Sequence, residues 1–178
     1  MRKLIESTFM TLDGVVSEPQ NWSAPYWDED HNAYAAGLMT DADALVLGRA
    51  TYEGFAQAWP TRSGDWYTDK INAMPKYVAS RTLTELTWNS TVLEGDAAEA
   101  VAKLKAADGG HLLKFGTGSF SKTLLEHKLV DEYHLWIFPV VAGRGDRLFD
   151  GIDLTHLQLL DATTFKSGIV VHKLTTKD

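Results

Sequence analysis

Apolar positions recur along the chain with two different periods, and these periods separate expected strands from expected helices. Short apolar runs bounded by glycine, proline or acidic residues predict strands, because an extended chain turns successive side chains to opposite faces. The predicted strands cover residues 3–10, 44–47, 76–80, 91–93, 111–115 and 131–141.

Helical spacing lies between these runs. One apolar face consists of Trp27, His31, Tyr34, Ala35 and Leu38. The first turn of the same helix carries the acidic residues 28–30, which suit the start of a helix. The segment 52–59 repeats that spacing, and another helix is expected after Gly118. The clearest helix is 97–107, which begins with a capping-box pattern and ends before two glycines.

Two apolar runs near the end, 158–165 and 169–174, flank a short link that contains Gly168 and predict an antiparallel hairpin. The alternation of strands and helices before it predicts an α/β fold. We expect three layers, with a mostly parallel twisted sheet and helices on both faces. No repeat, linker or shift in composition marks a boundary, so residues 1–178 are expected to form a single domain.

The amino-acid composition limits the kinds of partner that the protein is expected to bind. A net charge of −7 argues against nucleic acid, which is bound chiefly by clustered lysine and arginine. The chain has no cysteine, and its six histidines show no metal-ligand spacing, so no metal site is predicted. Glu6 interrupts any N-terminal signal sequence, and no run reaches the ~18 apolar residues of a membrane span, which predicts a cytoplasmic protein without a membrane partner.

Two strands lead through glycine turns into helices. After the strand 44–47 come Gly48, Arg49, Ala50 and Thr51, which place backbone N–H groups, a guanidinium and a hydroxyl at a helix start. This arrangement can hold a phosphate group, although an ordinary turn with a solvated arginine fits the segment equally well.

The second turn follows the strand 111–115 and consists of Gly116, Thr117, Gly118, Ser119 and Phe120. A dinucleotide-binding fingerprint needs a third glycine that is missing here, so a conventional Rossmann domain is not predicted. Two separate cradles suit a ligand that contains a pyrophosphate.

Polar residues also end the strand 76–80. Ser80 and Arg81 could hold the 2′-phosphate that distinguishes NADPH from NADH, or they could be ordinary residues of a surface turn. Aromatic residues crowd the first 67 positions, and Trp22 and Trp27 are candidates to stack on a flat substrate ring, although most aromatic clusters belong to the core.

These segments, in this order, resemble the family that contains dihydrofolate reductase and the reductase of riboflavin biosynthesis (the RibD C-terminal domain). Residues 11–14 resemble its "SLDG" motif and 47–53 its "GR-x-T-x-E" turn. The block 116–149 is similar to "GG-x-x-x-x-x-LL-x-x-x-LVDE", followed by a proline, a "G-x-G" and "LF". The similarity covers nearly the whole chain.

The resemblance implies NADPH as cofactor, with its pyrophosphate near residues 49–51, its 2′-phosphate near Ser80 and Arg81, and its nicotinamide half near residues 116–120. It implies hydride transfer to a small pterin- or pyrimidine-like heterocycle. Substrate is expected near Trp22, Trp27 and Asp28. The candidate proton donors are Asp13, Asp30 and His31, each with an alternative structural role.

A homodimer is also implied, and the run 133–141, apolar on both faces, is expected to need cover on both sides. The substrate side departs from the riboflavin branch, where a lysine follows "SLDG" and a glutamate precedes the glycine turn. Val15 and Phe115 stand at these positions. The alternative function is therefore an NADPH-binding module of the same fold without catalytic activity.

Overall fold

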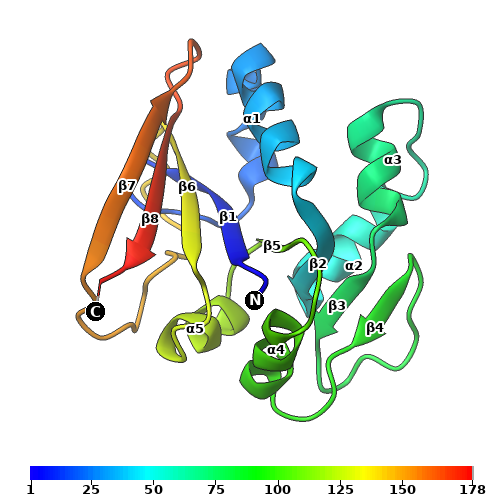
Figure 1. The fold of residues 1–178 in the computed structure, drawn as a ribbon. Coiled ribbons are helices and arrows are strands. Elements are labelled where there is room, and N and C mark those ends of the chain that lie inside the picture. Colours follow the sequence, from blue (N-terminus) through cyan, green and yellow to red (C-terminus); the bar gives the residue numbers. More distant parts are fainter. Residues whose placement is uncertain (178) are drawn as a thin grey trace.

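One twisted sheet of eight strands organises the helices of the protein (Figure 1). A computed structural model describes residues 1–177. The strands are β1 (Leu4–Thr11), β2 (Ala42–Gly48), β3 (Lys76–Ala79), β4 (Ser90–Val92), β5 (His111–Phe115), β6 (Glu132–Phe138), β7 (Leu157–Thr164) and β8 (Val170–Thr176). Their order is β4-β3-β2-β5-β1-β6-β8-β7, and all pairs from β4 to β6 are parallel. The predicted α/β fold with a C-terminal antiparallel hairpin is confirmed.

Helices cover both faces of this sheet, as predicted. The cluster of buried side chains on one face includes residues of α1 (Glu29–Thr40), α2 (Arg49–Ala58) and α3 (Trp66–Ala73). The cluster on the other face includes residues of α4 (Ala97–Ala106) and α5 (Ser119–Glu126). Successive strand residues divide between the two clusters, with Leu4 in one and Ile5 in the other. Within residues 1–177, none of the helices combines the length and the apolar character needed to cross a membrane.

Two helix starts differ from the prediction. Helix α3 buries only Thr68 and Ile71, so apolar periodicity does not predict it. Its start does carry a capping residue, Asp65. The Asp65 carboxylate accepts a hydrogen bond from the Thr68 backbone N–H at 2.9 Å. Trp27 lies before α1 rather than on its apolar face, because Asp28 is the N-cap and the helix begins at Glu29.

β6 is covered on both faces, as its sequence requires, but the cover comes from the same chain, so the apolar character of β6 is not evidence for a partner. Leu135 packs in the cluster that contains α4 and α5, and Trp136 packs with α1 and the C-terminal hairpin. Exposed apolar side chains include two on β7, an edge strand, where Leu159 and Leu160 are 54% and 45% exposed.

We propose that β7 pairs two chains into a homodimer, because an edge strand offers unpaired backbone groups beside apolar side chains. Light scattering at micromolar concentration is expected to give about twice the monomer mass of 19.7 kDa. Leu159→Asp should shift the mass towards the monomer, whereas Leu154→Asp, at an 89% exposed loop position, should not. A wild-type mass of 19.7 kDa would contradict the proposal.

Candidate functional site

Two strand-to-helix turns lie side by side at the carboxyl edge of the sheet. β2 leads through Gly48 into α2, and β5 leads through Gly116 and Gly118 into α5. β2 and β5 are neighbours in the sheet, with Leu47 and Phe115 paired in register. The first backbone N–H groups of a helix have no partner within it, so two sets of free donors open at one place.

The turn after β5 packs directly against the first turn of α2. Gly116 has a φ of 78°, in the left-handed region that favours glycine, and a Cβ at this position would overlap the side chain of Thr51. Gly118 also has a left-handed φ, of 112°, but a Cβ there would meet open space. The two turns can approach this closely only because residue 116 has no side chain.

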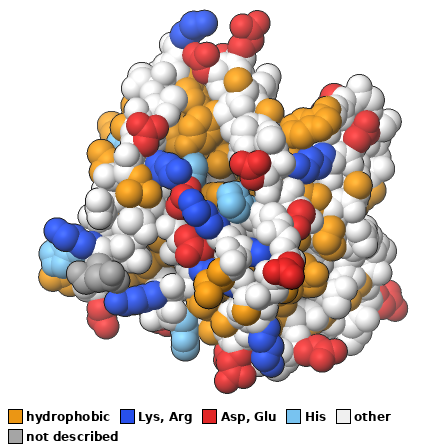
Figure 2. Space-filling model, viewed as in Figure 1, with side chains coloured by type: hydrophobic (Ala, Val, Ile, Leu, Met, Phe, Trp, Pro, Cys, Tyr) orange, Lys and Arg blue, Asp and Glu red, His pale blue; other side chains and the backbone are white. Residues whose placement is uncertain are grey.

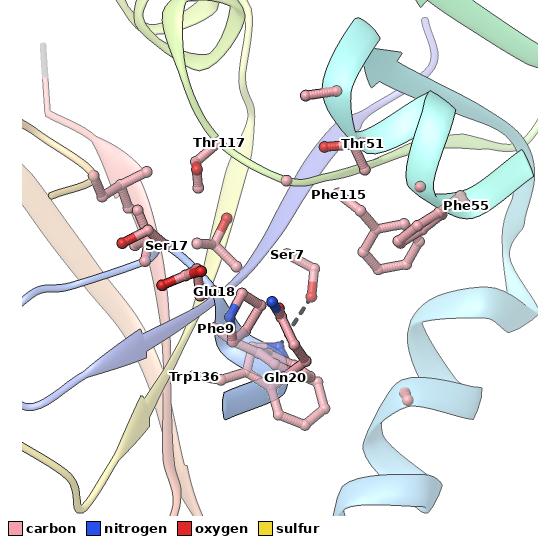
Figure 3. A pocket seen from close by; sticks show the side chains of 18 of the residues that line it. Ser7, Phe9, Ser17, Glu18, Gln20, Thr51, Phe55, Phe115, Thr117 and Trp136 are labelled. Atoms are coloured by element: carbon pink, nitrogen blue, oxygen red, sulfur yellow. Dashed lines mark hydrogen bonds between the residues drawn. The ribbon is translucent and has the colours of Figure 1, made fainter. Parts of the chain in front are cut away.

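A cavity of about 1310 Å³ opens in front of these turns (Figure 3). Its floor comes from the sheet, and its walls come from α1, α2, α3, α5 and the loops around 16–20 and 146–150. Residues that line it from the sheet are Ser7, Thr8, Phe9, Phe115 and Trp136, and those from the helices include His31, Asn32, Leu38, Phe55, Tyr67 and Ile71. The Trp136 Nε1–H donates to Ser7 Oγ at 3.0 Å, which fixes the indole across the floor.

His31 stands on the cavity wall inside a group of aromatic rings. Trp27 stacks on the imidazole with centroids 5.1 Å apart, and the rings of Phe9 and Trp136 approach it at 5.6 and 5.0 Å. The imidazole Nδ1 lies 3.3 Å from Asn32 Oδ1, whereas Nε2 is buried without a hydrogen-bond partner among the described residues. Burial lowers the pKa of His31, so a neutral ring with Nδ1–H donated to Asn32 leaves Nε2 as an acceptor.

Asp13 does not line the cavity. Its carboxylate accepts hydrogen bonds from the Thr11 hydroxyl at 2.6 Å and from the backbone N–H groups of Ala142 and Gly143 at 3.0 and 2.7 Å. These bonds lower the pKa of Asp13 to about 2, so the carboxylate stays ionised at neutral pH. The geometry gives Asp13 a structural position, tying the end of β1 to the loop after β6.

Asp28 and Asp30 do not line the cavity either, and both carboxylates accept hydrogen bonds from backbone N–H groups. Asp28 accepts from the His31 backbone N–H at 2.8 Å and from Ser167 N–H at 3.0 Å. Asp30 accepts from Lys166 N–H at 3.0 Å. Both carboxylates therefore fasten the start of α1 to the turn between β7 and β8.

Of the two tryptophans predicted to contact substrate, Trp27 lines the cavity and Trp22 does not. Trp22 packs edge-on against Phe138 at 5.2 Å, and its Nε1–H donates to Ser17 O at 3.1 Å. The structure thus uses Trp22 to hold the loop before α1.

Most residues of the two predicted cradles face the cavity. Those that line it are Ala50, Thr51, Gly116, Thr117, Gly118 and Ser119. Gly48 and Phe120 do not line the cavity. They lie next to each other, since a Cβ added to Gly48 would be 3.8 Å from Phe120 Cβ.

Arg49, Ser80 and Arg81 lie outside the cavity lining but near one another. Arg49 donates to Glu53 Oε1 at 2.8 Å and to the Thr82 hydroxyl. The Ser80 hydroxyl accepts from Leu83 N–H at 3.1 Å, which folds the turn after β3, and Arg81 is exposed. Arg49 therefore reaches the same turn that carries Arg81.

Several residues that line the cavity are not predicted from the sequence. Ser7 and Phe9 follow the period of two along β1, which could have indicated their shared face. Trp136 gives no local signal, because β6 reaches the cavity only through its pairing with β1. Glu18 also lines the cavity and has a left-handed φ of 50°, which nothing in its sequence indicates.

Comparisons with known proteins agree with this architecture. The family model "RibD C-terminal domain" matches residues 2–171. The uncharacterized protein YyaP of Bacillus subtilis (strain 168) is 30% identical over 175 residues, which cover 95% of this chain and 92% of YyaP.

Two crystal structures share the fold. One, a Shewanella sp. PV-4 protein named for riboflavin biosynthesis, has a TM-score of 0.79, 19% identity and 99% coverage of both chains. The other, a pyrimidine reductase-like protein from Corynebacterium diphtheriae, has a TM-score of 0.71 and 14% identity, with 99% of this chain and 92% of that chain covered. The protein described here therefore belongs to the RibD C-terminal domain family, a dihydrofolate reductase-like family of reductases.

Proposed function

We propose that the protein is an NADPH-dependent reductase that transfers a hydride to a pterin- or pyrimidine-like heterocycle. The observation that carries this proposal is the meeting of two glycine turns, each at a helix N-terminus, on the wall of one aromatic cavity. Two adjacent sets of free N–H donors suit a pyrophosphate, and the rings opposite suit flat reactants.

The residues present fit such a cofactor. Ala50 and Thr51 would hold the pyrophosphate, and residues 116–119 would hold the nicotinamide half along the same wall. A side chain on Gly116 would overlap Thr51, so the glycine keeps the two turns together on this wall. When bound, NADPH supplies the hydride.

The 2′-phosphate would lie over the turn after β3. Arg81 is exposed there, and Arg49 reaches the neighbouring Thr82. Two guanidinium groups at one turn suit a dianionic phosphate, because each can donate two parallel hydrogen bonds.

His31 is the proposed proton donor, because among Asp13, Asp30 and His31 it is the one that lines the cavity. Its Nε2 is buried without a hydrogen-bond partner in the described part of the chain, so a bound substrate would supply the missing contact, and Nε2 would donate a proton only from the protonated ring. Asn32 would orient the ring through Nδ1. The aromatic rings around it would exclude water and hold a flat acceptor next to Nε2.

The acceptor class rests on the shape of the cavity and on the similar proteins. The matched structures are named for riboflavin biosynthesis and as pyrimidine reductase-like. Phe115 lines the cavity where the riboflavin branch has a glutamate, so acceptor recognition would depend more on stacking. Val15 is buried and does not line the cavity, whereas its bridge partner Arg147 does. A cytoplasmic location stays a prediction from the sequence.

The second candidate is an NADPH-binding module without catalysis. The replacement of a polar residue by Phe115 on the cavity wall favours it, because one group that could contact a polar substrate is missing. Binding of NADPH without oxidation by any acceptor would identify this function.

NADPH is expected to bind more tightly than NADH, because Arg81 would contact the extra phosphate. Arg81→Ala should weaken NADPH binding by about 1.5 to 3 kcal/mol, the range for a hydrogen bond to a charged group, and leave NADH nearly unchanged. Titration by cofactor fluorescence measures both. Arg144→Ala, at an exposed loop arginine, is the matched control. Equal losses for the two cofactors would remove Arg81 from the site.

His31→Gln is expected to lower turnover about 10²-fold while NADPH affinity is retained, because the variant removes the titrating proton. A screen of NADPH oxidation over pterins, pyrimidines, quinones and small carbonyls first identifies the best acceptor. Wild-type turnover should fall as pH rises through the lowered pKa of His31, since the protonated form is the donor.

Asp30→Asn is the control for this experiment, because an amide oxygen can still accept from Lys166 N–H. It should keep near-normal turnover. Full activity in His31→Gln would show that another group or water donates the proton.

A further inference from the structure

A buried ion pair lies directly behind the second glycine turn. Glu6 of β1 and Lys114 of β5 are partners in the parallel ladder, and their side chains are 0% and 1% exposed. Because side chains alternate along a strand, Ser7 and Phe115 face the cavity while Glu6 and Lys114 point to the α5 side of the sheet. Lys114 Nζ lies 3.4 Å from Glu6 Oε1, which is long for a hydrogen bond, so the contact is mainly electrostatic.

The ammonium group of Lys114 also holds the turn itself. It donates to the carbonyl oxygen of Gly116 at 2.8 Å and to Ser121 Oγ, in the first turn of α5, at 2.6 Å. Two of the three donors of the ammonium group make these bonds, whereas both carboxylate oxygens of Glu6 are buried without a hydrogen-bond partner among the described residues. Lys114 therefore links the two ends of the segment 116–121, whose residues 116–119 line the cavity.

The turn is thus fixed from two sides. Thr51 touches Gly116 from α2, and Lys114 holds the Gly116 carbonyl from behind the sheet. A buried ion pair is seldom needed for stability alone, because apolar residues of similar volume usually serve as well. What an apolar residue cannot supply is a hydrogen-bond donor to this carbonyl and to the first turn of α5.

We propose that Lys114, with Glu6 as its counter-charge, is a positioning residue that sets the cofactor affinity of the turn without touching the cofactor. The proposal rests on the proposed NADPH-binding function. The free N–H donors of residues 117–119 then keep their arrangement before any ligand binds, because Lys114 holds the Gly116 carbonyl on one side of them and the Ser121 hydroxyl on the other.

The decisive variant is the double replacement Glu6→Gln/Lys114→Met. Lys114→Met alone would leave Glu6 buried without its counter-charge and would unfold part of the protein, whereas the double variant removes both charges and keeps the volume. The matched control is Lys76→Met. Lys76 is also fully buried in the sheet, but it donates to Asn72 O at 2.8 Å and lies 4.0 Å from the Trp88 ring centroid, and it is not a cavity residue.

Two readouts are compared in all proteins: the Kd for NADPH from cofactor fluorescence, and hydrogen exchange of residues 115–119 without cofactor. The double variant should keep a folded circular-dichroism spectrum, raise the Kd about tenfold, as the loss of one hydrogen bond to a charged group predicts, and speed exchange at the turn. Lys76→Met should change neither.

Ser121→Ala provides an independent test, because it removes one partner of the ammonium group without burying a lone charge. It should move both readouts in the same direction by a smaller factor, and it decides the question if the double variant does not fold. Unchanged exchange and an unchanged Kd in a folded double variant would overturn the proposal. If the wild-type protein binds no NADPH, the proposed function fails, and the exchange comparison still decides whether Lys114 fixes the turn.

Discussion

The close approach of the turn after β5 to the first turn of α2 is the constraint on which the candidate site depends. Parallel pairing of β2 with β5 brings both turns to one edge of the sheet, and the absence of a side chain at Gly116 lets the backbone reach Thr51. Two helix N-termini then open together on one cavity. A larger residue at position 116 would separate the two turns.

The opposite wall depends on polar groups that fasten α1 to the sheet. Tyr34 on α1 lies 2.7 Å from His134 Nδ1, and His134 Nε2 lies 3.2 Å from Glu132 Oε2. Because the Glu132 carboxylate also binds Lys3 and Lys173, its pKa falls to about 2, so it stays ionised and accepts from His134 Nε2–H. The remaining Nδ1 then accepts from the Tyr34 hydroxyl. This series of hydrogen bonds holds the helix that carries His31.

The sequence predicts elements well where the signal is local. Every predicted strand and the four predicted helices are present, because period and capping residues act over a few positions. The helix α3 is missed, since so little of it is buried.

The two glycine turns are also local signals, and six of their nine residues line the cavity. The direction in which the acidic side chains point is not determined by neighbouring residues in the sequence. Asp13 is held by Gly143, and Asp30 by Lys166, each more than 100 positions away, so only the tertiary structure separates these two carboxylates from His31.

NADPH binding in two glycine variants shows whether the contact between the turns forms the cofactor site. Gly116→Ala and Gly95→Ala place a side chain at nearly the same left-handed φ, of 78° and 74°, but only the first meets Thr51, whereas the second meets open space. With both proteins folded, we expect Gly116→Ala to lose affinity for NADPH about tenfold or more and Gly95→Ala to lose almost none. Equal affinities in the two variants would contradict the claim that the contact between the turns forms the cofactor site.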